Sequence, residues 1–387
     1  MRIQFSAYCL VPFCMLLGAC VEPFSPTVDA FEDILVVEGL ITYDSTHYSI
    51  KLSRTQPLIK HDSDMSNESG ISVSLIDSDS VVIRLLESME DPGVYTGTQP
   101  LQVGKTYILS IVTNEGKTYR SDPVEMKETP PIERVYFGRT TLPSNEYGDL
   151  VDGFQIYVDT GSGSVESEYY KLEWEETWEF MTPYHSFFDF DLQKDSIFER
   201  TENLSNCWIQ SLSTNLNLIS TENLSTGKIK GHPVRFISFR KSLLRVEYSI
   251  EVSQYALSQD SYYFWERVKE TSEQTGSLYD KQPSQPIGNI RNINDPTEFV
   301  LGYFDIATAT SKRIFINPND LPAEVKIPSL YSGCLQGADT VISFSQIPFF
   351  IGAGYLISRE ELGTGFEMVV KSCIDCRLKG SNVKPEL

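Results

Sequence analysis

Cys20 has the clearest chemistry of any residue in the sequence. It follows Leu17-Gly18-Ala19, and a thiol directly after such small residues is the type of site that is acylated in bacterial lipoproteins. The residues before it fit a signal peptide, with a positive charge at Arg2 and an apolar region from Phe5 to Leu17. That region is too short to cross a bilayer core, which needs about 20 residues. We therefore predict a signal peptide over 1–19 and a lipid anchor on Cys20; an ordinary cleaved signal peptide is the alternative.

The cysteines that follow Cys20 are candidates for disulfide bonds. Their number is even, which in an exported chain favours disulfides and allows three pairings. A zinc site built on Cys373-x-x-Cys376 is the alternative, although a structural zinc site normally uses two close pairs. A redox-active pair would need a strand-helix context that lowers the thiol pKa, and the sequence here indicates a strand end. The predicted disulfide residues are Cys207, Cys334, Cys373 and Cys376.

Carboxylates alternate with tryptophans in a segment that resembles a long strand. Paired carboxylates beside aromatic rings are typical of glycoside hydrolases. Alternate residues of a strand share a face, however, so Trp174, Glu176 and Trp178 are expected on one face and the other acids on the opposite one. This pattern favours buried tryptophans behind a row of solvated acids. If the rings are exposed, Trp174 and Trp178 are the candidate ligand contacts. The acids are Glu173, Glu175, Glu176 and Glu179.

The remaining motifs do not predict a metal, a cofactor or a catalytic residue. Asp62-x-Asp64-x-Ser66 resembles a calcium loop, but Asn67 stands where the turn glycine belongs, which favours a hairpin tip. The histidines lack metal-ligand spacing, and no Gly-x-Ser-x-Gly motif is present. The four histidines are His47, His61, His185 and His232.

The composition predicts an acidic globular protein. The net charge is -21, and -22 without the signal peptide that contains Arg2; 41% of the residues are hydrophobic. Nucleic acids and anionic lipid headgroups repel such a chain, so we expect no nucleic-acid partner. The longest apolar run after Cys20, Ile347 to Ile357, is interrupted by Pro348 and two glycines. The lipid is therefore predicted to be the sole membrane contact.

The elements that must position these residues are mainly β-strands. We interpret 20–31 as a tether. Closely spaced strands then predict an N-terminal β-sandwich of the immunoglobulin or transthyretin kind over 32–128. Thr129-Pro130-Pro131 cannot continue a central strand, so a domain boundary is placed there. A larger β-rich domain is predicted over 129–387, with one prominent helix near 259–275 that begins after Ser258 and ends before Gly276. The strands expected in the sandwich include 35–41, 47–53, 71–75, 81–86 and 107–111, and two further short strands are expected in the larger domain at 299–304 and 313–316.

Beside the lipid-attachment motif, the sequence contains in this order Leu35-Val36-Val37-Glu38-Gly39, Leu52-Ser53-Arg54-Thr55, Gly288-Asn289-Ile290, Val300-Leu301-Gly302-Tyr303-Phe304 and Cys373-Ile374-Asp375-Cys376-Arg377. Taken together, these motifs resemble the Bacteroidota lipoproteins that carry domain of unknown function 4249. The resemblance covers essentially the whole mature chain, although Pro385-Glu386-Leu387 departs from the family's tail. It implies an outer-membrane lipoprotein associated with TonB-dependent transporters, without an established enzymatic activity, and it transfers no catalytic residue.

Together these features predict a non-enzymatic, lipid-anchored outer-membrane protein. We expect a binding or accessory subunit of a TonB-dependent uptake system, on the cell surface or the periplasmic face. One alternative is a surface glycan or peptide hydrolase that uses Glu175 and Glu176 beside the two tryptophans. Another is a structural or adhesive surface protein.

Overall fold

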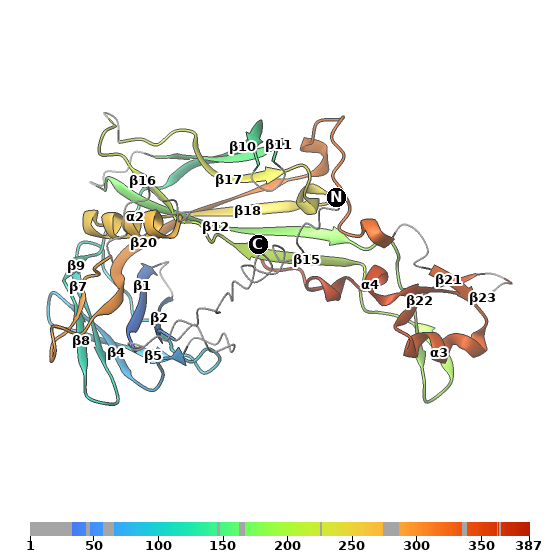
Figure 1. Cartoon of the computed structure of the whole chain (residues 1–387), viewed down its shortest axis with the longest axis horizontal. Helices are drawn as coiled ribbons and strands as arrows, with labels where there is room; N and C mark the ends of the chain where they lie inside the picture. The colour runs from blue at the N-terminus through green and yellow to red at the C-terminus, as the bar shows by residue number, and fades with distance from the viewer. Residues whose placement is uncertain are drawn as a thin grey trace, which may run out of the picture.

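The chain forms a mainly β protein with few helices, as the sequence predicts. The computed structural model describes residues 33–43, 47–56, 66–144, 148–161, 167–224, 227–273, 286–334, 339–361, 363 and 365–387. A first sandwich lies beneath one end of a longer second sandwich, and a small C-terminal lobe extends from the other end (Figure 1). The predicted signal peptide, the tether and Cys20 lie outside the described residues. Within the described ranges, no helix is long and apolar enough to cross a membrane.

The first sandwich encloses a single hydrophobic core. Its strands alternate as expected: Ile50 and Leu52 point inward and are fully buried. β5 joins its two faces, since its first residues pair with β4 and its last two pair with β6. The strands are β1 (Leu35–Tyr43), β2 (Tyr48–Arg54), β3 (Ser66–Asn67), β4 (Ser72–Asp77), β5 (Val82–Glu87), β6 (Val94–Gly97), β7 (Thr106–Val112), β8 (Thr118–Ser121) and β9 (Val124–Glu125).

Two strands from much later in the chain complete this sandwich. β20 (Val300–Ile316) runs parallel to β1, and β19 (Ile290–Asn292) pairs with β8. Phe304 and Ile306 of β20 are fully buried in the first core. The core therefore contains residues beyond the 32–128 segment that the sequence predicts for this domain.

The second sandwich packs two sheets around another core. β20 contributes its last eight residues to the larger sheet, where it pairs with β18. The sequence predicts two short strands at 299–304 and 313–316, but the structure has one strand that serves both sandwiches (Figure 1). The smaller sheet consists of β10 (Ile132–Pro143), β11 (Leu150–Thr160) and β17 (His232–Ser238). Besides β20, the larger sheet contains β12 (Tyr169–Met181), β15 (Asn206–Leu212), β16 (Asn217–Ser220) and β18 (Tyr248–Leu257).

Helix α2 (Gln259–Glu273) is the helix that the sequence predicts, and it lies where the two sandwiches meet (Figure 1). The Ser258 hydroxyl accepts a hydrogen bond from the backbone N–H of Ser261 at 3.2 Å, which caps the first turn. The ring of Phe264 packs on Tyr303 of β20, with 5.2 Å between centroids. The predicted end at Gly276 lies outside the described residues.

The C-terminal lobe contains small β elements and short helices around two small cores. The lobe combines a hairpin from the middle of the chain with a separate three-stranded sheet from its end. The hairpin is β13 (Phe188–Asp191) and β14 (Ser196–Glu199); the sheet is β21 (Asp339–Ile342), β23 (Gly365–Val370) and β22 (Tyr355–Glu361); the helices are α3 (Ile347–Gly352) and α4 (Lys371–Ile374).

Candidate functional site

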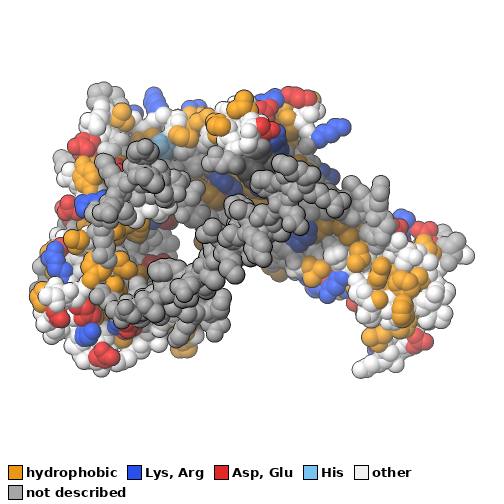
Figure 2. Space-filling model, viewed as in Figure 1, with side chains coloured by type: hydrophobic (Ala, Val, Ile, Leu, Met, Phe, Trp, Pro, Cys, Tyr) orange, Lys and Arg blue, Asp and Glu red, His pale blue; other side chains and the backbone are white. Residues whose placement is uncertain are grey.

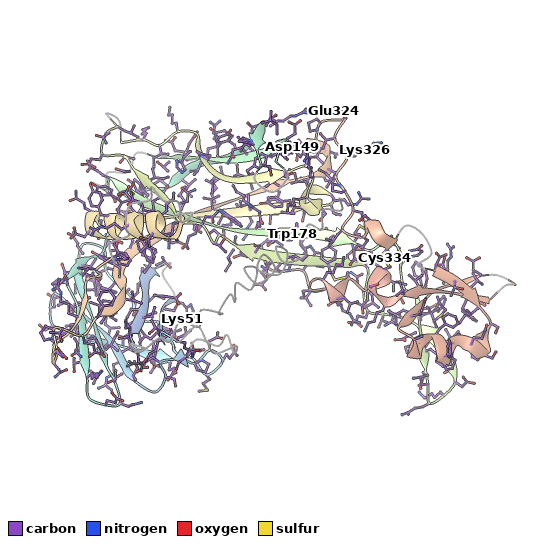
Figure 3. All side chains as sticks on the ribbon, viewed as in Figure 1. Lys51, Asp149, Trp178, Glu324, Lys326 and Cys334 are labelled. Atoms are coloured by element: carbon purple, nitrogen blue, oxygen red, sulfur yellow. A yellow bond between two sulfur atoms is a disulfide. The ribbon has the colours of Figure 1, made fainter. Side chains whose placement is uncertain are left out.

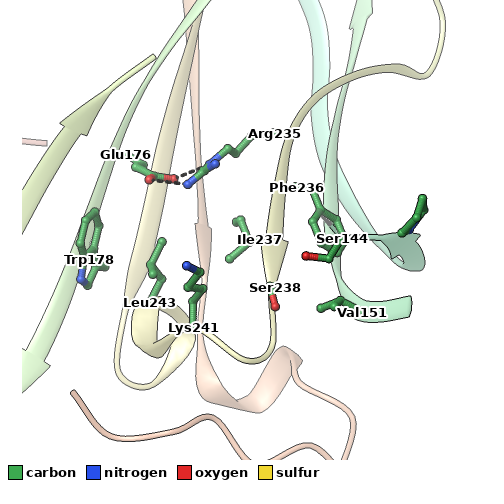
Figure 4. A pocket seen from close by; sticks show the side chains of 11 residues that line it. Ser144, Val151, Glu176, Trp178, Arg235, Phe236, Ile237, Ser238, Lys241 and Leu243 are labelled. Carbon is green, nitrogen blue, oxygen red and sulfur yellow. Dashed lines mark hydrogen bonds and ion pairs between the residues drawn. The ribbon is translucent and has the colours of Figure 1, made fainter. Parts of the chain in front are cut away.

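A cavity of about 570 Å³ opens at one end of the second sandwich, between β12 on one side and β11 and β17 on the other. Trp178 and Glu176 of β12 face Arg235 and Ile237 of β17 across this space, and Leu243 lies at its base (Figure 4). The cavity therefore includes one of the two tryptophans that the sequence singles out.

Successive side chains of β12 point to opposite faces of the sheet, and this alternation determines on which face each acid and each tryptophan lies. Trp174 and Trp178 are half-buried and pack against the second core. The neighbouring acids belong to the opposite face: Glu175 accepts a hydrogen bond from Gln210 at 3.0 Å, and Glu179 accepts one from Asn206 at 3.1 Å. Glu175 and Glu176 thus face opposite sides of the sheet.

Glu176 is the exception, because it is a carboxylate on the inward face and only 3% of its side chain is exposed. Arg235 binds both of its oxygens, from Nε to Oε2 at 3.0 Å and from Nη2 to Oε1 at 2.9 Å (Figure 4). The buried Tyr248 hydroxyl donates to Oε2 at 2.6 Å. Three donors hold the carboxylate, as a buried charge requires.

The environment of this cluster changes the pKa of both partners of Glu176. Burial, with the adjacent Glu176 carboxylate, raises the pKa of Tyr248 well above its usual value, so the phenol remains a donor. Burial alone lowers the pKa of Arg235, but hydrogen bonds and charge from Glu176 outweigh it and the pKa is raised. The guanidinium also lies 4.7 Å from the centre of the Trp174 ring. The cluster links the two sheets.

Sequence reasoning found Glu176 but missed Arg235 and Tyr248. One available signal was the position of Arg235, which precedes Ile237 by two residues in a strand and therefore shares its inward face. An arginine on an otherwise apolar face indicates a buried acidic partner.

The geometry of the cavity fits binding better than acid-base chemistry. Catalysis by two carboxylates requires both to flank one substrate, whereas Glu175 and Glu176 lie on opposite faces and Glu176 is already paired with Arg235. The other walls offer the Trp178 ring and the aliphatic side chains of Ile237 and Leu243, together with the polar side chains of Ser144, Ser238 and Lys241. Such walls fit an apolar or flat ring surface of a ligand.

Three of the segments that carry the family resemblance, 35–39, 288–290 and 300–304, meet at the junction of β1 and β20. Val37 lies opposite Gly302 in the parallel pair. Asn289 binds the same part of β20: its side-chain amide donates to the Phe304 carbonyl, and its side-chain oxygen accepts from the Phe304 N–H, both at 2.8 Å. Gly302 has a φ of +110°, and a Cβ there would lie 2.0 Å from the Val37 oxygen. Glycine is therefore required at this position.

A family model described as Domain of unknown function (DUF4249) matches residues 21–313. The chain belongs to this family. No curated protein matches it.

The DUF4249 match covers the first sandwich, most of the second and the whole length of β12 and β17. The C-terminal lobe contributes only its β13–β14 hairpin and nearby residues to the matched range. The tail Cys373-Ile374-Asp375-Cys376-Arg377, which supports the resemblance in the sequence, lies beyond the DUF4249 match.

The four predicted disulfide cysteines form two bonds, Cys207–Cys376 and Cys334–Cys373. The disulfide prediction is confirmed, and these thiols are not zinc ligands. One bond ties the C-terminal segment to β15, and the other ties α4 to the turn that contains Cys334, at the junction with the lobe (Figure 3). Both bonds anchor the part of the chain that follows the DUF4249 match.

The segment Asp62-x-Asp64-x-Ser66, for which the sequence favours a hairpin tip over a calcium loop, lies largely outside the described residues: Asp62, Asp64 and His61 are not described, and Ser66 belongs to β3. His185 contacts Ser205 at 2.8 Å, and His232 contacts Asn217 at 2.8 Å. In the described part of the DUF4249 chain, no group of three or more histidine, cysteine or acidic residues has the geometry of a metal site.

Proposed function

We propose that this protein is a lipid-anchored, non-enzymatic binding or accessory subunit of a TonB-dependent uptake system in an outer membrane. The observation that carries the proposal is the cavity beside Trp178, whose buried carboxylate, Glu176, is held by Arg235 and Tyr248. A carboxylate that is fully engaged in this way stabilises the wall of a binding site. Trp178 is the proposed ligand contact in the cavity, and Trp174 supports the wall beneath Arg235.

Three features support export and anchoring. The Leu17 to Cys20 motif fits lipid attachment, and the net charge of -21 fits a protein held at a membrane by lipid alone. Two disulfides are typical of an oxidising compartment outside the cytoplasm. We propose Cys20 as the lipidated residue, on the cell surface or the periplasmic face.

Co-purification tests the partner directly. The full chain is isolated from detergent-solubilised membranes of cells grown under conditions that induce uptake, beside a Cys20→Ala variant. We expect a TonB-dependent transporter with the parent protein and a loss of membrane association in the variant. Recovery of the Cys20-lipidated protein without a transporter would contradict the proposal.

The cavity is tested by the pair Trp178→Ala and Trp265→Ala. Trp265 is half-buried on α2 and does not line the cavity, so it is the matched control. We expect slower uptake with the first variant and normal uptake with the second. Equal effects of the two variants would remove Trp178 from the binding site.

The hydrolase alternative rests on the acids interleaved with tryptophans in β12. It is tested with a panel of glycans and peptides and the variants Glu175→Gln and Glu176→Gln. If the parent protein turns over a substrate and both variants lose this activity, a hydrolase function would replace the binding proposal. An adhesive role would instead appear as lost adhesion, with unchanged uptake, on deletion of the gene.

A further inference from the structure

A segment of the C-terminal lobe lacks charge over 19 consecutive residues, 340–358, in a chain in which 22% of the residues are charged. The segment runs from β21 through helix α3 into β22, beyond the range matched by the family model. Its sequence includes Ile347-Pro348-Phe349-Phe350-Ile351, which forms most of α3. Such a run on the surface of an acidic protein calls for an explanation.

Helix α3 is apolar on its outer side as well as its inner side. Ile347 is fully buried beneath it, whereas 74% of Phe349 is exposed. Phe350 and Ile351 are half-buried. A helix at the surface of a globular protein normally has a polar outer face, and a helix that is apolar all round is normally covered. In the described structure nothing covers the outer side of α3.

The apolar side chains around α3 are continuous. The rings of Phe349 and Phe350 are 5.6 Å apart, and those of Phe350 and Tyr355 are 5.2 Å apart. Figure 2 shows hydrophobic side chains gathered over this lobe. Exposed aromatic clusters of this kind mark interaction sites. We call the following residues the α3 patch: Pro348, Phe349, Phe350, Ile351 and Tyr355.

The charge of the surrounding lobe selects the kind of partner. The segments of the lobe near the patch, 182–206 and 339–371, contain nine carboxylates and four cationic side chains. An excess of carboxylates in the lobe repels anionic lipid headgroups, and membrane-inserting faces usually carry Lys or Arg with Trp. If the partner were a second copy of this chain, two negatively charged lobes would face and repel each other. The four cationic side chains are Lys194, Arg200, Arg359 and Lys371.

We propose that the α3 patch is the docking surface for another protein, which presents an apolar groove with basic side chains at its rim. Phe349 is the central anchor, because it is the most exposed aromatic residue of the patch and has a ring neighbour on its inner side. The surface requires a protein partner but not a transporter, so this proposal and the proposed function fail independently.

Photocrosslinking in the native membrane tests the docking surface. The full chain carries p-benzoylphenylalanine in place of Phe349 or, as a matched control, in place of Met89, which is fully exposed on the first sandwich. We expect one discrete adduct with another protein from the first position and none from the second. The crosslinked peptide of that protein should adjoin Lys or Arg residues. An adduct with a second copy, equal adducts from both positions, or none would overturn the proposal.

Binding of the identified protein is then measured with Phe349→Ser and Met89→Ser. We expect roughly 30-fold weaker binding for the first variant, as for a central interface aromatic residue, and no change for the second. Affinity should also fall as salt rises. Phe349 is mostly exposed, so the variant should fold normally, which intact disulfides and unchanged tryptophan fluorescence would verify. Flotation with phosphatidylethanolamine–phosphatidylglycerol vesicles that Phe349→Ser abolishes would overturn the proposal in favour of a lipid surface.

Discussion

Replacement of Arg235 by methionine should destabilise the second sandwich strongly. Methionine keeps an unbranched apolar side chain but removes every donor of the guanidinium. Glu176 would then retain one partner, the Tyr248 hydroxyl at 2.6 Å, while only 3% of its side chain is exposed. Removal of one member of a buried ion pair leaves an uncompensated charge and costs about 3–5 kcal/mol. We expect a loss of that size in the free energy of unfolding.

The double variant Glu176→Met with Arg235→Met isolates the cause. It removes both charges and leaves apolar side chains at two inward positions. Apolar replacement of a whole buried pair is often neutral or stabilising, but here it also removes the acceptor of the buried Tyr248 hydroxyl, so we expect the double variant to recover part of the loss. Arg291→Met is the surface control: Arg291 binds Asp122 at 3.1 Å, but the two side chains are 64% and 51% exposed. Its loss should cost about 1 kcal/mol or less.

Unfolding in urea, followed by tryptophan fluorescence with the disulfides intact, measures these differences. Trp174 lies beneath the Arg235 guanidinium and Trp178 borders the cavity, so both report on this sandwich. Far-ultraviolet circular dichroism follows the whole chain and shows whether unfolding is a single transition. If Arg235→Met costs as little as Arg291→Met, or if the double variant is no more stable than Arg235→Met, Glu176 is not held as a buried, paired charge.

Three further predictions concern the first sandwich and the disulfides. Gly302→Ala should separate β1 from β20 and lower the yield of folded protein, because its Cβ would lie 2.0 Å from the Val37 oxygen; normal thermal stability would contradict this. Glu298 accepts hydrogen bonds from Tyr119 and Lys117, and these, with Asn292, outweigh the effect of burial and lower its pKa. The folded pKa of Glu298 lies below its unfolded pKa, so the ionised side chain stabilises the fold above about pH 4.3, and this stabilisation is lost as pH falls through the folded pKa. Glu298→Gln should therefore lower the free energy of unfolding by about 1–3 kcal/mol at pH 7 and by progressively less in acid. A difference in stability that does not depend on pH would refute the assignment. Thiol counting on the denatured, unreduced ectodomain should find none of the four cysteines after Cys20 free, and a count of two or more would contradict the two disulfides.

Local patterns in the sequence predicted the local elements well. Strict alternation identified β2, where Tyr48, Ile50 and Leu52 are buried as expected. Ser258 and the helical spacing after it identified α2, and the Ser258 cap is present. The even number of cysteines predicted disulfides, but not their pairing. These features depend on neighbours within a few residues, which a single sequence displays.

The long-range pairings were not predictable in the same way. The middle of β20, from Asp305 to Lys312, is rich in Ala and Thr and has no clear apolar alternation, so the sequence predicted two short strands on either side. This stretch is nevertheless strand, because it pairs with β1 and with β18. The contact of Glu176 with Arg235 similarly joins strands 59 residues apart. Neither partner shows in its own sequence which residue it meets.

β20 determines how the parts of the molecule are held together. Its residue Thr308 pairs with Tyr43 in the first sandwich, and the next residue, Ala309, pairs with Tyr255 in the second. The segment predicted as a domain boundary is fixed at the same place, because the Thr129 N–H donates to the Thr308 hydroxyl at 2.7 Å and the Thr129 hydroxyl accepts from the Ala256 N–H at 2.9 Å. Relative motion of the two sandwiches would require the breakage of these backbone ladders.

The same continuity extends to the C-terminal lobe. β15 belongs to the sheet that contains β20, and its Cys207 is bonded to Cys376 of the tail. The start of the described chain at Asp33, the cavity beside Trp178 and the α3 patch therefore lie on one covalently and hydrogen-bonded frame. A protein docked on Phe349 would be held in a fixed relation to the cavity, rather than tethered to it by a linker. Such a frame fits a subunit that presents a bound ligand to a partner without changing its own shape.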